Sequence, residues 1–119
     1  MAKDPASKVQ VDILQGTLDL LILKAVSLGP LHGYGILVRL QQISNDALQI
    51  PQGSIYPALY RLEHSGCIEA EWGESENNRK SKFYRLTAVG RKKLASETAY
   101  WGRLTEAIGE VLNAKPAEA

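Results

Sequence analysis

The chain has little cysteine and no long apolar run. Cys67 is its single cysteine, so an intramolecular disulfide is excluded, as is typical of a protein in a reducing compartment. The longest stretches without a charged residue, 25–38 and 47–60, contain proline and glycine and are shorter than the roughly 20 apolar residues of a membrane-spanning helix. Residues 1–12 carry charges of both signs and no apolar block of the kind that a secretory signal has. We therefore expect a cytoplasmic protein with no membrane association.

The length and composition are those of one globular domain. The chain has 119 residues, of which 45% are hydrophobic and 23% are charged, close to the average soluble domain. A chain of this length buries roughly two thirds of its unfolded surface, which is enough for one core. A two-domain enzyme is therefore not expected, and the sequence has no internal repeat or low-complexity segment.

The net charge of +1 is unevenly distributed along the chain. Segment 79–93 has no acidic residue, and its basic residues are Arg79, Lys80, Lys82, Arg85, Arg91, Lys92 and Lys93. An acidic run precedes it, formed by Glu69, Glu71, Glu74 and Glu76. Charge alone fits a solvated hairpin as well as an anion-binding surface, so the order of the secondary-structure elements must distinguish them.

Hydrophobic spacing predicts two helices in the first third of the chain. Apolar residues recur at helical spacing over 14–28, and the pair Gly29-Pro30 is typical of a helix end. A shorter apolar set over 36–43 predicts a second helix that begins around 32–35 and ends before Ser44. His32 stands where a helix begins, so we expect it to cap or pack there.

A third helix is predicted after Pro51. Its apolar residues recur at i, i+4 and i+7 as Ile55, Leu59 and Leu62, and Gly66 stands in the C-cap position. Because a proline beyond the first turn removes a backbone hydrogen bond, Pro57 predicts that the regular helix begins near Ser54. The face opposite the apolar stripe carries Gly53, Tyr56, Pro57, Tyr60 and His64.

The last third of the chain predicts a β-hairpin and a long helix. Residues 67–72 alternate in polarity and 81–86 are rich in aromatic residues, with a polar tip over 73–80 between them. Thr87 is a suitable N-cap for the final helix. Its apolar residues follow a seven-residue frame that breaks at Glu97: Leu94, Trp101, Leu104, Ile108 and Val111.

Three helices followed by a hairpin are the order of a winged helix-turn-helix domain, in which the third helix enters the major groove of DNA and the hairpin follows the backbone. This order gives the basic segment a function. Small or hydroxyl residues near the start of the third helix let its backbone approach a phosphate, which the helix dipole also favours. The alternative is an ordinary amphipathic helix with a solvated face.

Three motifs carry a family resemblance. They are Leu-His-Gly-Tyr at 31–34, Gly-Ser-Ile-Tyr-Pro-Ala-Leu-Tyr-Arg-Leu-Glu at 53–63, and Tyr-Arg-Leu-Thr at 84–87 followed by Gly90. Together they closely resemble the PadR family of bacterial transcriptional regulators, over about 13–112. The resemblance implies a homodimeric winged-helix protein that binds double-stranded operator DNA, usually as a repressor.

The predicted fold is mainly α with a small β-hairpin. Residues 1–10 are expected to form a flexible segment, 11–87 the winged helix-turn-helix domain, 88–113 the C-terminal dimerisation helix of the family's short form, and 114–119 a flexible tail. Tyr60 departs from the family pattern, since many relatives have a basic residue there. By the resemblance, Ser54, Tyr56 and Arg61 fall on the family's recognition-helix positions and Arg79, Lys80 and Lys82 on its wing. The full set of predicted DNA-binding residues also includes Gln52, Tyr60 and Tyr84.

Dimerisation is predicted through the last helix, with the first helix against the partner, because a short monomer has little means to cover the apolar stripe. The predicted interface residues are Leu14, Leu18, Leu94, Trp101, Leu104, Ile108 and Val111. Trp101 fits the dimer core or, as in some short relatives, a platform for a small planar aromatic effector between the subunits.

Other functions have less support in the sequence. His64 and Cys67 straddle the end of a helix without further metal ligands nearby, so no metal site and no cofactor are expected. Cys67 lacks the orienting group of a Cys-His nucleophile, which argues against an enzyme and favours a small buried residue. A winged-helix adaptor that binds proteins instead of DNA remains the alternative, and a wing without net positive charge would favour it.

Overall fold

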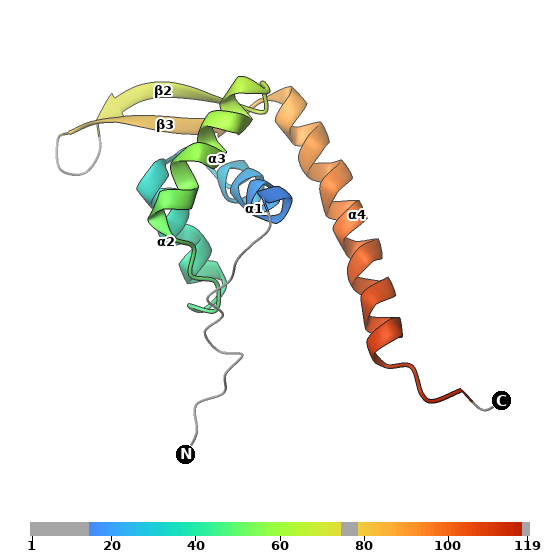
Figure 1. Ribbon diagram of the computed structural model, residues 1–119. Coiled ribbons are helices and arrows are strands. Elements are labelled where there is room, and N and C mark those ends of the chain that lie inside the picture. The colour runs from blue at the N-terminus through green and yellow to red at the C-terminus, as the bar shows by residue number, and fades with distance from the viewer. Residues whose placement is uncertain (1–14, 75–78, 118–119) are drawn as a thin grey trace, which may run out of the picture.

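The computed structural model describes residues 15–74 and 79–117. Leu14, the whole of the predicted N-terminal segment 1–10 and the centre of the hairpin tip lie outside these residues. The elements, in chain order, are α1 (Gln15–Ser27), β1 (Leu31–His32), α2 (Gly33–Ile43), α3 (Gln52–His64), β2 (Ile68–Glu74), β3 (Lys80–Leu86) and α4 (Ala88–Leu112). This order confirms a mainly helical winged helix-turn-helix fold, with a long helix at its C-terminal end (Figure 1).

The core lies where α1, α2 and α3 pack together at the base of the sheet. Ile22 and Leu23 of α1, Ile36 of α2 and Ile55 of α3 are completely buried in it. Leu18 is only 5% exposed and belongs to the same cluster, so its predicted place in a dimer interface is wrong. The apolar stripe of α1 is used inside the chain because two other helices pack on it.

The predicted hairpin is part of a three-stranded antiparallel sheet in the order β1-β3-β2. The two-residue strand β1 pairs with β3 through Leu31 with Tyr84 and His32 with Phe83. Periodicity over two residues carries no strand signal, which is why the sequence analysis missed β1. The β2–β3 pairing extends to Glu74 and Lys80, and this hairpin projects beyond the helices as the wing (Figure 1).

Helix α3 begins two residues earlier than predicted, at Gln52 with Pro51 as its N-cap. A tight bond from the amide of Ser54 to the carbonyl of Pro51, 2.9 Å long, closes the first turn. Pro57 therefore lies in the second turn and withholds a hydrogen bond only from the carbonyl of Gly53. Gly53 is exposed, so water can satisfy that carbonyl and the helix tolerates the proline.

The predicted boundaries of α3 and α4 are otherwise confirmed by their caps. Gly66 follows α3 with a φ of +80°, a conformation that favours glycine at a helix C-terminus. The hydroxyl of Thr87 accepts the amide of Gly90 at 3.0 Å and so caps α4. Gly90 packs against the backbone of Cys67 where a Cβ would clash with the Cys67 carbonyl oxygen.

Helix α4 runs away from the rest of the fold, and most of it packs against no other described element (Figure 1). Its 25 residues span about 37 Å. The radius of gyration, 17.1 Å, exceeds the about 13.5 Å of a compact chain of this length. In the described ranges, no helix combines the length and apolarity needed to cross a bilayer.

Candidate nucleic-acid interface

Helix α3 presents one apolar and one polar face. Ile55, Leu59 and Leu62 are buried as predicted, which turns Tyr56 and Tyr60 outward. The residues at its N-terminal end, Gln52, Gly53 and Ser54, are exposed or half-buried. The positive end of the helix dipole is therefore accessible at this end of α3.

The start of α2 lies against this face because Gly33 has no side chain. A Cβ on Gly33 would lie 2.7 Å from Cε1 of Tyr56, so the tyrosine ring occupies the space that a side chain would need. His32 caps α2, as predicted, through Nδ1, which accepts the amide of Gly35 at 3.0 Å. With His32 turned to its own helix, the neighbouring Tyr34 is left exposed.

A groove of about 860 Å³ separates α2 from the wing, with Tyr56 between them. It brings together Tyr56, Arg79, Lys80, Lys82 and Tyr84 of the predicted set. Residues that the sequence analysis did not assign to DNA binding also line it: Tyr34, Arg39, Gln42 and Trp72. The motif at 31–34 was a signal for Tyr34, whereas Arg39 and Gln42 follow only from the packing of α2.

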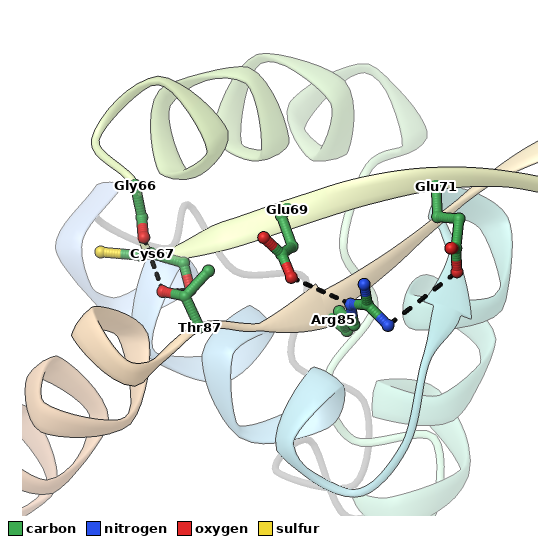
Figure 2. Close-up of polar contacts among 6 residues, drawn as sticks. All are labelled: Gly66, Cys67, Glu69, Glu71, Arg85 and Thr87. Atoms are coloured by element: carbon green, nitrogen blue, oxygen red, sulfur yellow. Dashed lines mark hydrogen bonds and ion pairs between the residues drawn. The ribbon is translucent and has the colours of Figure 1, made fainter.

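The two faces of the wing differ in charge. On the outer face, Nε of Arg85 lies 3.0 Å from Glu69 and its Nη1 lies 3.9 Å from Glu71, so two carboxylates neutralise this cation (Figure 2). Lys80 and Lys82 lie on the inner face, the side of the groove. Arg85 therefore does not contribute to the basic surface, although the sequence counted it with the others.

Lys82 is shared between the wing and α3. Its Nζ lies 3.5 Å from Oε1 of Glu63, with both side chains about 40% exposed, and 5.9 Å from the centre of the Tyr84 ring. The ion pair links the wing to α3. To bind an external anion, Lys82 must therefore break its ion pair with Glu63 or interact with both groups at once.

Tyr84 lines the groove but is only 6% exposed and belongs to the core cluster, so little of its side chain is accessible for the predicted DNA contact. Residues alternate along β3, and position 84 falls on the face that the helices cover. Burial raises the pKa of the Tyr84 phenol above its ordinary value of 10.0, and Glu63 and Tyr56 raise it further while Lys82 lowers it. The phenol is therefore neutral at physiological pH.

Arg61 has a partner inside the chain. Its Nη2 donates to Oδ1 of Asp19 on α1 at 2.8 Å, and both side chains are partly buried. Its Nε is buried, and no described residue accepts a hydrogen bond from it. This ion pair joins α3 to α1, so the structure gives Arg61 a positioning role that its place on the helix face did not predict.

The end of α3 and the start of α4 are joined through Thr87. Its hydroxyl lies 2.6 Å from the carbonyl of Gly66 and 3.0 Å from that of Cys67 (Figure 2). Cys67 is buried, as expected for a small apolar residue. His64 stacks on Tyr60 with ring centroids 6.0 Å apart, and the described part of the chain holds no cluster of metal-ligating side chains.

Helix α4 keeps an uncovered apolar stripe. Leu94, near its start, is half-buried against the core, whereas Trp101 is 45% exposed and Ile108 and Val111 are exposed as well. Leu104 is half-buried between them. Such a stripe on a protruding helix is typical of a surface that another chain covers.

Comparison with known proteins gives one family. The model of the transcriptional regulator PadR-like family matches residues 22–96. An uncharacterised protein from Lysinibacillus sphaericus is 32% identical over 100 residues, which are 84% of this chain and 92% of that protein.

Two crystal structures have the same fold. A PadR-like transcriptional regulator from Bacillus cereus is 27% identical, with a TM-score of 0.74 over 88% of this chain and all of that one. A PadR family regulator from Eggerthella lenta is 28% identical, with a TM-score of 0.71 over 85% of this chain and 86% of that one.

Proposed function

The chain belongs to the PadR-like family of transcriptional regulators, a family of regulators rather than enzymes, and we propose that it represses transcription as a homodimer on an inverted-repeat operator. The observation that carries the proposal is the groove beside α3, which combines Arg39, Lys80 and Lys82 with exposed tyrosines. Cations attract the phosphates of duplex DNA, and aromatic rings and amides supply contacts within a groove.

In this proposal α3 enters the major groove. Gln52 and Ser54 approach the bases or the backbone from the N-terminal end of the helix, and Tyr56 and Tyr60 extend the contact along the exposed face. Arg61 holds α3 on α1 through its ion pair with Asp19. It therefore affects specificity by positioning α3. Tyr34 joins the interface because it is exposed in the same groove.

The wing contributes affinity that is independent of sequence. Arg79, Lys80 and Lys82 meet phosphates next to the major-groove contact, as cations on a wing do. Lys80 is exposed, whereas Lys82 begins from its pair with Glu63. The charges of the hairpin 68–86 sum to zero, so the preference for DNA binding over a protein-binding adaptor rests on Lys80 and Lys82 lining the groove and not on the net charge of the wing.

Dimerisation through α4 supplies the two-fold symmetry. Trp101, Leu104, Ile108 and Val111 offer a stripe that a second α4 can cover. Each subunit then binds one half-site, and the half-sites are separated by about one helical turn of DNA or a multiple of it. Trp101 lies near the middle of this helix, so a planar aromatic effector that stacks there would act by favouring one arrangement of the dimer.

A footprint of the purified protein over the region upstream of its own gene tests the function. We expect a protected segment with dyad symmetry and binding that weakens as salt rises. Binding that does not distinguish this region from mixed-sequence DNA would refute sequence-specific regulation. A protected segment without a dyad would refute the homodimer, and transcription that rises on binding would refute repression.

A further inference from the structure

Trp72 lies on the inner face of the wing. Residues alternate along β2, so Ile68, Ala70 and Trp72 share one face, and Trp72 is the register partner of Lys82. Ile68 is buried and Ala70 half-buried under the helices, but Trp72 is 65% exposed. The apolar face of the strand thus continues past the end of the core.

The aromatic residue on the outer face of the wing, unlike Trp72, has neighbours within the chain. Phe83 lies there against Gly73, where a Cβ would come within 3.1 Å of the ring, and its ring meets that of His32 edge to face at 5.6 Å. Phe83 is therefore partly covered within the chain. Trp72 faces the groove instead, together with Tyr34 and Tyr56.

The surroundings of Trp72 indicate what covers it. Lys82 lies beside it, and Lys80 lies two residues away on β3, opposite Glu74, so on this face Trp72 has two lysines and one carboxylate around it. The sugar-phosphate backbone of DNA has the matching chemistry, with apolar deoxyribose between charged phosphates. Exposure of a large apolar side chain to water is unfavourable. Packing of the Trp72 ring against a sugar would remove part of that apolar surface from water and so stabilise the complex.

We propose that Trp72 packs against the deoxyribose of bound duplex DNA and thereby sets the position of the wing on the backbone. The inference rests on the proposed DNA-binding function and adds to it a contact that is not electrostatic. Lysine contacts release counterions, so their contribution falls with salt, but the packing of an indole on a sugar releases none. Trp72 therefore supplies the part of the wing's affinity that persists at high salt.

The test uses the full chain, labelled with 5-fluorotryptophan, and a mixed-sequence DNA duplex. The chain has two tryptophans, Trp72 and Trp101, and the Trp72→Phe variant assigns their fluorine signals. DNA should shift the Trp72 signal. In fluorescence anisotropy, Trp72→Ala should weaken binding about tenfold and leave the slope of log affinity against log salt unchanged, whereas Lys80→Ala should lower that slope by about 0.9. Trp72→Phe should restore most of the affinity.

Each other outcome overturns the inference in a recognisable way. Normal DNA binding without a shift of the Trp72 signal refutes the contact and leaves the proposed function intact. A slope that falls in Trp72→Ala shows that Trp72 only positions a lysine. A Trp72 signal that moves with protein concentration in the absence of DNA identifies a surface between copies of the chain. Wild-type protein that binds neither this duplex nor the region upstream of its own gene refutes the proposed function itself. Circular dichroism confirms that the variants fold, and once the two signals are assigned the shift itself is read on the wild-type chain.

Discussion

Glu63 should restrain DNA binding by holding Lys82. The carboxylate lies 3.5 Å from the Lys82 ammonium, and removing its charge with Glu63→Gln frees the lysine for a phosphate while keeping the shape of the side chain. At this distance the attraction is about 1 kcal/mol in water. Both side chains are more than a third exposed, so the net value is about 0.2 to 1 kcal/mol. Glu63→Gln should therefore tighten binding to mixed-sequence DNA by up to about fivefold.

A double-mutant cycle separates this pair from general charge effects. If Lys82 must leave Glu63 to bind, Lys82→Ala should cost more affinity in the Glu63→Gln background than in the wild type. Glu63→Gln should also steepen the salt slope by up to about 0.9, one further phosphate contact. Anisotropy titrations with a labelled duplex at several salt concentrations measure both quantities.

The matched control is Glu71→Gln, which removes the same charge from the outer face of the wing, where Glu71 lies 3.9 Å from Arg85. It should change affinity much less than Glu63→Gln, because it releases no cation into the groove. Equal effects of the two variants would show that only net charge matters. A Lys82→Ala cost that is the same in both backgrounds would refute the coupling between Glu63 and Lys82.

Three further predictions concern packing and assembly. Gly33→Ala should displace the ring of Tyr56, 2.7 Å from the new methyl group, and weaken DNA binding in anisotropy titrations with little loss of thermal stability; unchanged affinity would exclude Tyr56 from the interface. Gly90→Ala should lower the free energy of unfolding in urea by about 1 to 3 kcal/mol because its Cβ meets backbone, whereas Gly102→Ala, with open space around it, should raise it by up to about 1 kcal/mol. Ile108→Glu should convert the dimer to a monomer in sedimentation velocity, and a wild-type monomer at micromolar concentration would reject dimerisation through α4.

The sequence by itself determined the features that depend on neighbouring residues. Helical periodicity located α1 to α4, and the caps at His32, Gly66 and Thr87 could be predicted because each acts within a few residues of its helix end. The inward face of α3 followed from three residues at helical spacing. These are local rules, in which the covalent chain already brings the interacting groups together.

Only the tertiary structure determines which polar and apolar residues remain exposed and can contact another molecule. Tyr84 and Leu18 had the right type for an interface, but other elements cover them. Arg61 forms an ion pair with Asp19, and Lys82 forms one with Glu63. The partners of each pair lie on different elements, so the periodicity of the sequence cannot predict these pairs.

Both the groove and the sheet depend on contacts between residues that are far apart in the sequence. Strand β1 exists because Leu31 and His32 meet β3 about 50 residues later in the chain, and Tyr34 and Trp72 line one groove only because α2 and the wing lie on either side of it. Local sequence patterns determine which face of an element is apolar, whereas long-range packing determines what that face meets. The sequence could therefore predict the elements of the winged helix-turn-helix fold, and the structure was needed to sort their residues into core, internal ion pairs and exposed groove.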